Sequence, residues 1–201
     1  METSKLPSNK RPRGFTLMET MIAIVILSVG MLSLAALMSK MTGSTEQSRY
    51  MSMAALLASE KLEDLNRLPN IDPEVAVSGG SLTTDVGNQS VTFNGSTELV
   101  DYYDSVMISS GNGSISETMV GKDASGTVTY STITHSPDGT VNPVISTTAP
   151  VIAPDLLQFR RRWAVEKDAP VTGVRRITVG VTLTSPAGGP PVNFQMSMVR
   201  P

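Results

Sequence analysis

The stretch MIAIVILSVGMLSLAALM, residues 21–38, decides the fold of this chain, because every residue in it is apolar or small. No charged residue lies between Glu19 and Lys40. A helix of about twenty such residues is about 30 Å long, which matches the thickness of the hydrocarbon layer of a membrane. The sequence therefore predicts a hydrophobic transmembrane helix in residues 15–40.

A short basic leader, residues 1–14, precedes this helix. Pro7 and Pro12 discourage regular structure in it. Basic segments next to a membrane helix stay in the cytoplasm, so we expect a single pass with the N-terminus inside and the rest of the chain outside. A secretory signal would end in small residues of the A-x-A kind, which the sequence MSKM at 38–41 lacks. The charged residues of the leader are Lys5, Lys10, Arg11 and Arg13, against a single Glu2.

Glu19 is not explained by a plain membrane anchor, because an ionised carboxylate at the mouth of an apolar segment costs free energy unless it is paired. It ends the string RGFTLME, residues 13–19. This string resembles the processing site of the type IV prepilins, which has glycine before the cut, phenylalanine after it and glutamate as the fifth mature residue. The resemblance implies that a prepilin peptidase of the bacterial inner membrane cleaves between Gly14 and Phe15 and methylates the new amine of Phe15.

The same resemblance implies a role for Glu19 in subunit assembly. Its carboxylate would pair with the cationic amine of Phe15 in a neighbouring subunit, and a buried charge pair of this kind sets register more than it adds stability. The alternative is that Glu19 is an interfacial residue of a single-pass anchor.

Residues 41–68 have the pattern of an amphipathic stem helix. Pro69 and Pro73 predict that it ends near Leu68. Its segment 54–65 is similar to the helix of the V-type minor pilins, the type IV pilus modification proteins. The charged residues that fall largely off the apolar face are Glu46, Glu60, Lys61, Glu63, Asp64 and Arg67. The apolar face repeats every three or four residues, at Met51, Ala54 or Ala55, Ala58, Leu62 and Leu65.

Residues 69–150 are rich in Gly, Ser and Thr, and they predict loops and hairpins with short strands near 90–93, 100–108 and 127–134. Gly79 and Gly80 are expected in a turn. Four aspartates lie near expected turns and lack the spacing of a calcium loop, so turn formation explains them better. They are Asp101, Asp104, Asp123 and Asp138.

Residues 151–201 predict three strands in an antiparallel β-meander, because apolar residues alternate in three runs separated by turn-rich segments. The phrases RWAV at 162–165 and GVRRITV at 173–179 are again similar to V-type minor pilins. The chain has no cysteine, whereas many major pilins close this region with a disulfide. The apolar residues of the runs are Leu157, Phe159, Trp163 and Val165; Ile177, Val179, Val181 and Leu183; and Val192, Phe194, Met196 and Met198.

The polar residues suggest neither catalysis nor a cofactor. Without cysteine there is no thiolate metal ligand and no thiol nucleophile, and the lone His135 has no partner ligand at a suitable spacing. The Ser-rich loops contain no Gly-x-Ser-x-Gly element or other hydrolase grouping. We therefore expect no enzyme, no metal site and no cofactor, and we expect His135 to be solvated.

The charge pattern does not favour nucleic acid. The formal net charge is -2, so only a local basic cluster could bind phosphate, as some minor pilins do. We expect these side chains to line the solvent faces of two neighbouring strands, offset by Glu166, Asp168 and Asp155. The cluster consists of Arg160, Arg161, Arg162, Arg175 and Arg176.

Together these features predict an α+β fold in which a long N-terminal transmembrane and stem helix packs on a small antiparallel β-sheet, the type IV pilin fold. The resemblance implies a type IV minor pilin that starts as a single-pass precursor in the inner membrane and ends in a pilus, in the periplasm or at the cell surface. Its implied partners are prepilin peptidase, other pilins through the N-terminal helix, and the pilus assembly platform. The alternative is a pseudopilin of a type II secretion system; a membrane-anchored enzyme and a DNA-binding minor pilin are less favoured.

Overall fold

The structure is a computed structural model that describes residues 15–109, 111–122, 125–151, 156–185 and 192–201. The chain divides into two units, Met1–Ser44 and Thr45–Pro201. Helix α1 (Leu17–Arg67) begins in the first unit and ends in the second. The other elements are α2 (Pro73–Ala76), β1 (Gly79–Gly80), β2 (Gln89–Phe93), β3 (Ser96–Val100), β4 (Tyr103–Ser109), β5 (Ile115–Lys122), β6 (Val128–His135), β7 (Val141–Ser146), β8 (Leu156–Lys167), β9 (Arg175–Ser185) and β10 (Asn193–Arg200).

In the first unit, α1 is apolar enough and long enough to cross a membrane. Its apolar side chains are exposed along the described part of this unit. The hydroxyl groups of its few polar residues bond back to the helix: Ser28 donates to the carbonyl oxygen of Val25 at 2.8 Å, and Ser33 to that of Val29 at 2.9 Å. The segment therefore leaves these side-chain donors satisfied without water, as a membrane helix requires.

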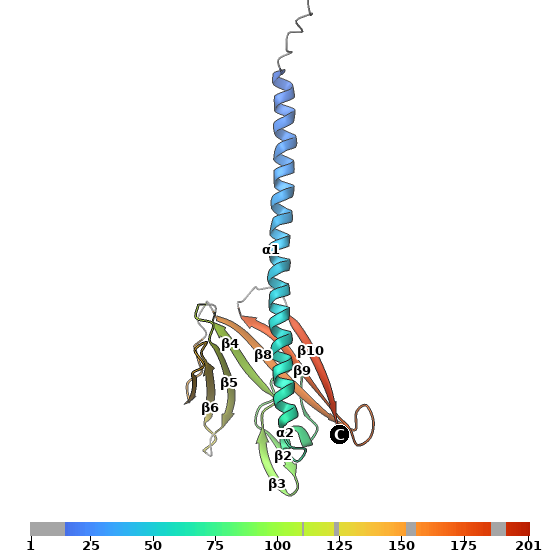
Figure 1. The fold of residues 1–201 in the computed structure, drawn as a ribbon, viewed down its shortest axis with the longest axis vertical. Helices are drawn as coiled ribbons and strands as arrows, with labels where there is room; N and C mark the ends of the chain where they lie inside the picture. The colour runs from blue at the N-terminus through green and yellow to red at the C-terminus, as the bar shows by residue number, and fades with distance from the viewer. Residues whose placement is uncertain (1–14, 110, 123–124, 152–155, 186–191) are drawn as a thin grey trace, which may run out of the picture. The chain divides into compact units, whose positions relative to one another are not determined.

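In the second unit, the sheet has the strand order β10-β9-β8-β4-β5-β6-β7, and every pairing along this order is antiparallel. Strand β8 is central, because β9 pairs with one of its edges while β4 and β1 follow one another along the other edge. Strands β2 and β3 form a separate hairpin. Figure 1 shows β4 running beside β8, with which it pairs.

The predicted fold class is confirmed: a long N-terminal helix packs, through its last turns, on an antiparallel sheet. The sheet is larger than the predicted meander of β8, β9 and β10, because it contains eight strands. Four of the added strands, β4 to β7, come from the Gly/Ser/Thr-rich region. Its short apolar runs gave no hint that β4 would join β8, since pairing across such a sequence distance depends on tertiary contacts.

Gly79 and Gly80 form a strand segment on β8 rather than the predicted turn. Gly80 has a φ of +79°, and a Cβ atom there would lie 2.1 Å from the carbonyl oxygen of Trp163. A side chain at this position is therefore impossible without moving the backbone, so glycine serves close approach here.

The core lies between the sheet and the part of α1 that belongs to the second unit. Trp163, Phe159 and Tyr102 are fully buried, and Ile177, Val179 and Val181 of β9 lie with them. The predicted apolar face of the helix is largely right, with Leu57 as an addition. The buried helix residues are Ala54, Leu57, Ala58, Lys61, Leu62 and Leu65.

Helix α1 ends at Arg67, one residue before the predicted end. The guanidinium of Arg200, at the end of β10, donates to the carbonyl oxygens of Leu65 and Leu68, both at 2.8 Å. These carbonyl groups have no partner within the helix, so a cation from the last strand satisfies the C-terminal end of the helix and complements its dipole.

Candidate functional site

The N-terminus of α1 begins with a reciprocal hydrogen-bond pattern between Thr16 and Glu19. The Thr16 amide and hydroxyl donate to Oε2 of Glu19 at 2.9 and 3.0 Å, and the Glu19 amide lies 3.3 Å from the Thr16 hydroxyl oxygen. This is a capping box, in which two residues three positions apart satisfy each other's free amides at a helix start. The spacing Thr-x-x-Glu was visible in the sequence, but its capping role was missed.

The capping box places the start of the helix two residues after the predicted cleavage position. Phe15 is 86% exposed and precedes the first helical residue, Leu17. Gly14 lies outside the described residues. Cleavage at Gly14 and methylation of Phe15 therefore stay predictions, as does the assembly role of Glu19.

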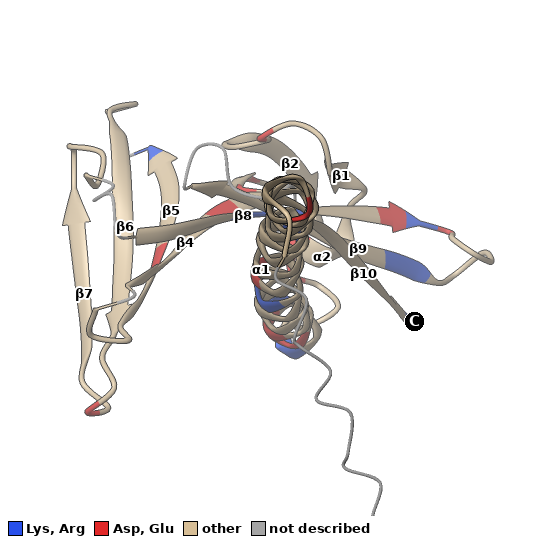
Figure 2. Cartoon of the chain, turned by 90° about the horizontal axis from the view of Figure 1, so that it is seen from above, with Lys and Arg blue, Asp and Glu red and all other residues tan. Residues whose placement is uncertain are grey.

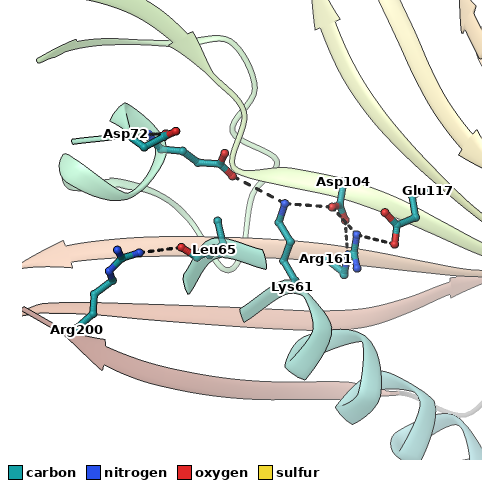
Figure 3. A network of polar contacts seen from close by, with 8 residues as sticks. Lys61, Leu65, Asp72, Asp104, Glu117, Arg161 and Arg200 are labelled. Atoms are coloured by element: carbon teal, nitrogen blue, oxygen red, sulfur yellow. Dashed lines mark hydrogen bonds and ion pairs between the residues drawn. The ribbon is translucent and has the colours of Figure 1, made fainter. Parts of the chain in front are cut away.

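A network of buried charges lies between α1 and the sheet of the second unit (Figure 3). Asp104 of β4 and Arg161 of β8 are 2% and 1% exposed. Nε of Arg161 donates to Oδ1 of Asp104 at 2.7 Å, and Nη2 donates to Oδ2 at 2.8 Å. Two parallel hydrogen bonds of this kind are the strongest form of an arginine–carboxylate pair.

Lys61 connects this pair to the helix. Its Nζ lies 3.8 Å from Oδ2 of Asp104, 3.9 Å from Oε1 of Glu74, and 4.0 Å from the centre of the Trp163 ring. The ammonium group is thus held by two carboxylates and by the face of an aromatic ring, which attracts cations. Burial raises the pKa of Glu74, and the nearby Lys61 lowers it by a smaller amount.

Two further carboxylates approach Arg161 from the edges of the network. Oε1 of Glu117 on β5 lies 3.4 Å from Nη2, and Oε2 of Glu60 on α1 lies 3.7 Å from Nη1. The network therefore links α1, β4, β5, β8 and the short helix α2 through charged contacts. Such a network fixes the position of a helix on a sheet, because removing one partner leaves another charge buried without compensation.

The network corrects three predictions from the sequence. Lys61 was placed off the apolar face of the helix, Asp104 was assigned to a turn, and Arg161 was expected on a solvent face; all three are buried. The alternation of β8 contained the signal for Arg161, because this residue lies between Phe159 and Trp163 on the inward-facing side. The burial of Lys61 could not be predicted from the sequence pattern, because its partners Glu74 and Asp104 come from other elements of the fold.

The remaining arginines of the basic cluster are engaged with acidic groups or carbonyl oxygens. Asp85 lies 3.2 Å from Arg160 and 2.7 Å from Arg162. Figure 2 shows basic and acidic segments next to each other where β8 and β9 run together. These contacts neutralise the cluster and do not favour binding of a polyanion. Arg176 bonds to Glu166 at 2.6 Å, and Arg175 donates to the carbonyl oxygen of Asn70 at 3.2 Å.

Three other acidic residues singled out in the sequence accept hydrogen bonds from backbone amides. Asp138 accepts hydrogen bonds from the amide and hydroxyl of Thr140, as predicted for a turn. Asp101 accepts from the amide of Asn88 at 2.6 Å, and Asp168 accepts from the amide of Gly173 at 2.8 Å. Asp123 and Asp155 lie outside the described residues.

His135 is the last residue of β6 and is exposed, as predicted. Among the residues that the structure describes, no three His, Cys, Asp or Glu side chains are grouped so that they could hold a metal ion.

These features define an α+β protein in which a capped apolar helix, long enough to cross a membrane, continues into a sheet-bearing unit. A family model described as the prokaryotic N-terminal methylation motif matches residues 9–35, which include the predicted cleavage position and most of the apolar helix. The motif and the apolar helix support the assignment of the chain as a type IV prepilin-like protein. No curated protein and no solved structure matches it.

Proposed function

We propose that this chain is a type IV minor pilin, a structural subunit of a type IV pilus and not an enzyme. The observation that carries the proposal is the methylation motif at residues 9–35 at the start of a helix that is apolar and long enough to cross a membrane. Helices of this kind anchor the precursor in the inner membrane and later pack together in a fibre. The similarity of segments 54–65, 162–165 and 173–179 to V-type minor pilins supports the minor-pilin assignment.

In this proposal prepilin peptidase cleaves between Gly14 and Phe15 and methylates Phe15. The precursor lies in the inner membrane with its leader in the cytoplasm, as its basic residues favour. On assembly Glu19 pairs with the amine of Phe15 of a neighbouring pilin, and the pilus assembly platform inserts the subunit into the fibre. The charged groups of the second unit support a structural role, because Lys61, Asp104 and Arg161 are directed toward one another rather than toward a cavity.

Mass spectrometry of the mature chain tests the processing step. The expected N-terminus is N-methylated Phe15, and it should be absent from cells that lack prepilin peptidase. An N-terminus at Met1, or one beyond Lys40, would contradict the assignment.

A second measurement separates a pilus subunit from a pseudopilin of a type II secretion system, which shares the same processing. Surface fibres are sheared from the cells, and the chain is quantified in the sheared fraction and in the envelope. We expect the chain in the sheared fibres. Its retention in the envelope, together with loss of protein secretion when its gene is deleted, would instead assign it to a pseudopilus.

A further inference from the structure

Strand β10 forms an open edge of the main sheet. It pairs with β9 over its whole length without a register shift, and no backbone hydrogen bond to its other side occurs among the described residues. The amide of Leu183 donates to the carbonyl oxygen of Val192 at 3.3 Å. In an antiparallel pair such bonded positions recur every second residue, so Asn193, Gln195, Ser197 and Val199 direct their N–H and C=O groups outward.

This edge lacks the features that usually protect an outer strand, which are proline, charge and bulges. Strand β7, at the opposite end of the sheet, carries Pro143 near its middle. Between Asn193 and Val199, by contrast, β10 contains neither proline nor charge. Its backbone is therefore a ready template for one more strand.

The two faces of β10 specify the kind of strand that would fit. Phe194, Met196 and Met198 pack against the core on the side of α1, whereas Gln195 and Ser197 lie on the opposite, more exposed side. An added strand would continue both faces. It would need apolar residues on the side of α1 and uncharged polar residues on the other side.

The direction of β10 restricts the source of that strand. Arg200 bonds to the carbonyl oxygens of Leu65 and Leu68, so β10 ends where α1 ends. Within this unit, α1 and β10 therefore run in the same sense (Figure 1). Subunits that assemble through their helices have parallel stems, so antiparallel pairing of two β10 strands would reverse one stem. Parallel pairing of two β10 strands would place the two α1 helices on opposite faces of the joined sheet, so the apolar face of β10 would not be continued. In a second copy of this chain the other outer strand, β7, carries Pro143 and offers a poorer partner.

We propose that the open edge of β10 pairs, in parallel, with an edge strand from the sheet of a different prepilin-like subunit. The inference rests on the proposed function, because it assumes that the chain assembles with other subunits. The added strand would join the two sheets through backbone hydrogen bonds. It would give this subunit a preferred neighbour in the fibre.

The substitution Gln195→Pro tests the pairing, because proline removes the outward N–H group of residue 195 and leaves the bonds between β10 and β9 in place. Gln195→Ala is the matched control, since it shortens the same side chain and keeps the N–H group. We expect Gln195→Pro to lower the fraction of the chain recovered in sheared pili about tenfold relative to Gln195→Ala, from the lost bond and the clash of the ring. Equal recovery of the two variants would overturn the proposal.

Two further measurements on the same samples show whether a lower recovery of Gln195→Pro arises from the edge of β10. The N-methylated Phe15 terminus should be present in both variants, and its absence from both would count against the proposed function and not against the edge. The denaturation curve followed by the fluorescence of Trp163, the single tryptophan of the chain, should match that of Gln195→Ala, which shows that the sheet is intact.

If Gln195→Pro fails to fold, cross-linking decides the question without it. The chain has no cysteine, so Ser197→Cys can be labelled with a benzophenone maleimide and irradiated in assembled pili. Ser131→Cys on β6, also exposed, is the control position. The proposal expects a cross-link to a strand of another prepilin-like subunit, located by mass spectrometry, from residue 197 and not from residue 131. A cross-link to a second copy of this chain, or equal products from both positions, would overturn it.

Discussion

The guanidinium of Arg161 holds the carboxylate of Asp104 through two parallel hydrogen bonds, of 2.7 and 2.8 Å, across the boundary between β8 and β4. Neither side chain is more than 2% exposed. Each charge therefore depends on the other for its stability inside the protein.

Asp104→Ala should destabilise the second unit by about 3–5 kcal/mol, because it leaves both Arg161 and Lys61 without their shared carboxylate. Arg161→Met should cost less, since Asp104 keeps Lys61 at 3.8 Å. The double variant should cost less than the two single costs combined. The measurement is urea unfolding of the detergent-solubilised chain, followed by the fluorescence of Trp163. Costs that simply add would show that the pair is not coupled.

Glu74 should make the stability of this unit depend on pH. Burial raises its pKa in the folded protein above the ordinary 4.5, so the folded state binds the proton more tightly than the unfolded chain does. The stabilisation from the protonated Glu74 is fully present below pH 4.5. It is lost as the pH rises through the raised pKa of Glu74 in the folded protein. The unfolding free energy of wild type should therefore fall over this interval.

Glu74→Gln should flatten that part of the pH profile, because the amide does not titrate. The comparison is a series of urea unfolding curves from pH 4 to pH 7 (about 0.5 unit apart) for the two proteins. Glu60 also has a pKa raised by burial, so a smaller slope should persist in Glu74→Gln. An unchanged slope would mean that the titration of Glu74 does not contribute to the pH dependence of the unfolding free energy.

Arg200→Ala should lower the unfolding free energy by about 2 kcal/mol, because the carbonyl oxygens of Leu65 and Leu68 lose a charged donor at the end of α1. Arg67→Ala is the control, because it removes another arginine at the C-terminal end of α1. Arg67 bonds to Glu63 at 2.7 Å, but both side chains are mostly exposed, so its loss should cost under about 0.5 kcal/mol. Similar losses in the two variants would argue against a capping role for Arg200.

Glu19→Gln separates the two roles available to Glu19, because glutamine can still accept the hydrogen bonds of the capping box but carries no charge. We expect Glu19→Gln to be inserted and cleaved normally and to enter pili hundreds of times less efficiently than wild type, since an unpaired charge in a buried contact costs about 3–5 kcal/mol. The amounts in sheared pili and in the membrane fraction are compared.

Thr16→Val provides the converse change, because it removes the hydroxyl of the capping box and leaves the charge of Glu19. It should reduce pilus entry only slightly, since a lost helix cap costs about 1 kcal/mol. If Glu19→Gln enters pili as wild type does and Thr16→Val does not, the role of Glu19 is capping and the proposed charge pairing is wrong.

The sequence predicted the elements whose signal is local. The apolar run 21–38, the prolines after Arg67 and the alternation of β8, β9 and β10 each specify structure through neighbouring residues. The position of β4 could not be predicted, because it depends on pairing with β8 far along the chain. Lys61 and Asp104 were misassigned for the same reason: a charged residue is expected at the surface until its buried partner is known.

The place of β4 between β5 and β8 also sets the order in which this protein can fold. The ribosome delivers the chain from the N-terminus, so strands β4 to β7 emerge before β8 does. They can form hairpins at once, but Asp104 must wait for Arg161, 57 positions later. During this wait the edge of β4 that later receives β8 is uncovered, and such an edge captures other extended chains. We therefore expect a newly made chain to be most open to aggregation between the emergence of β4 and that of β8.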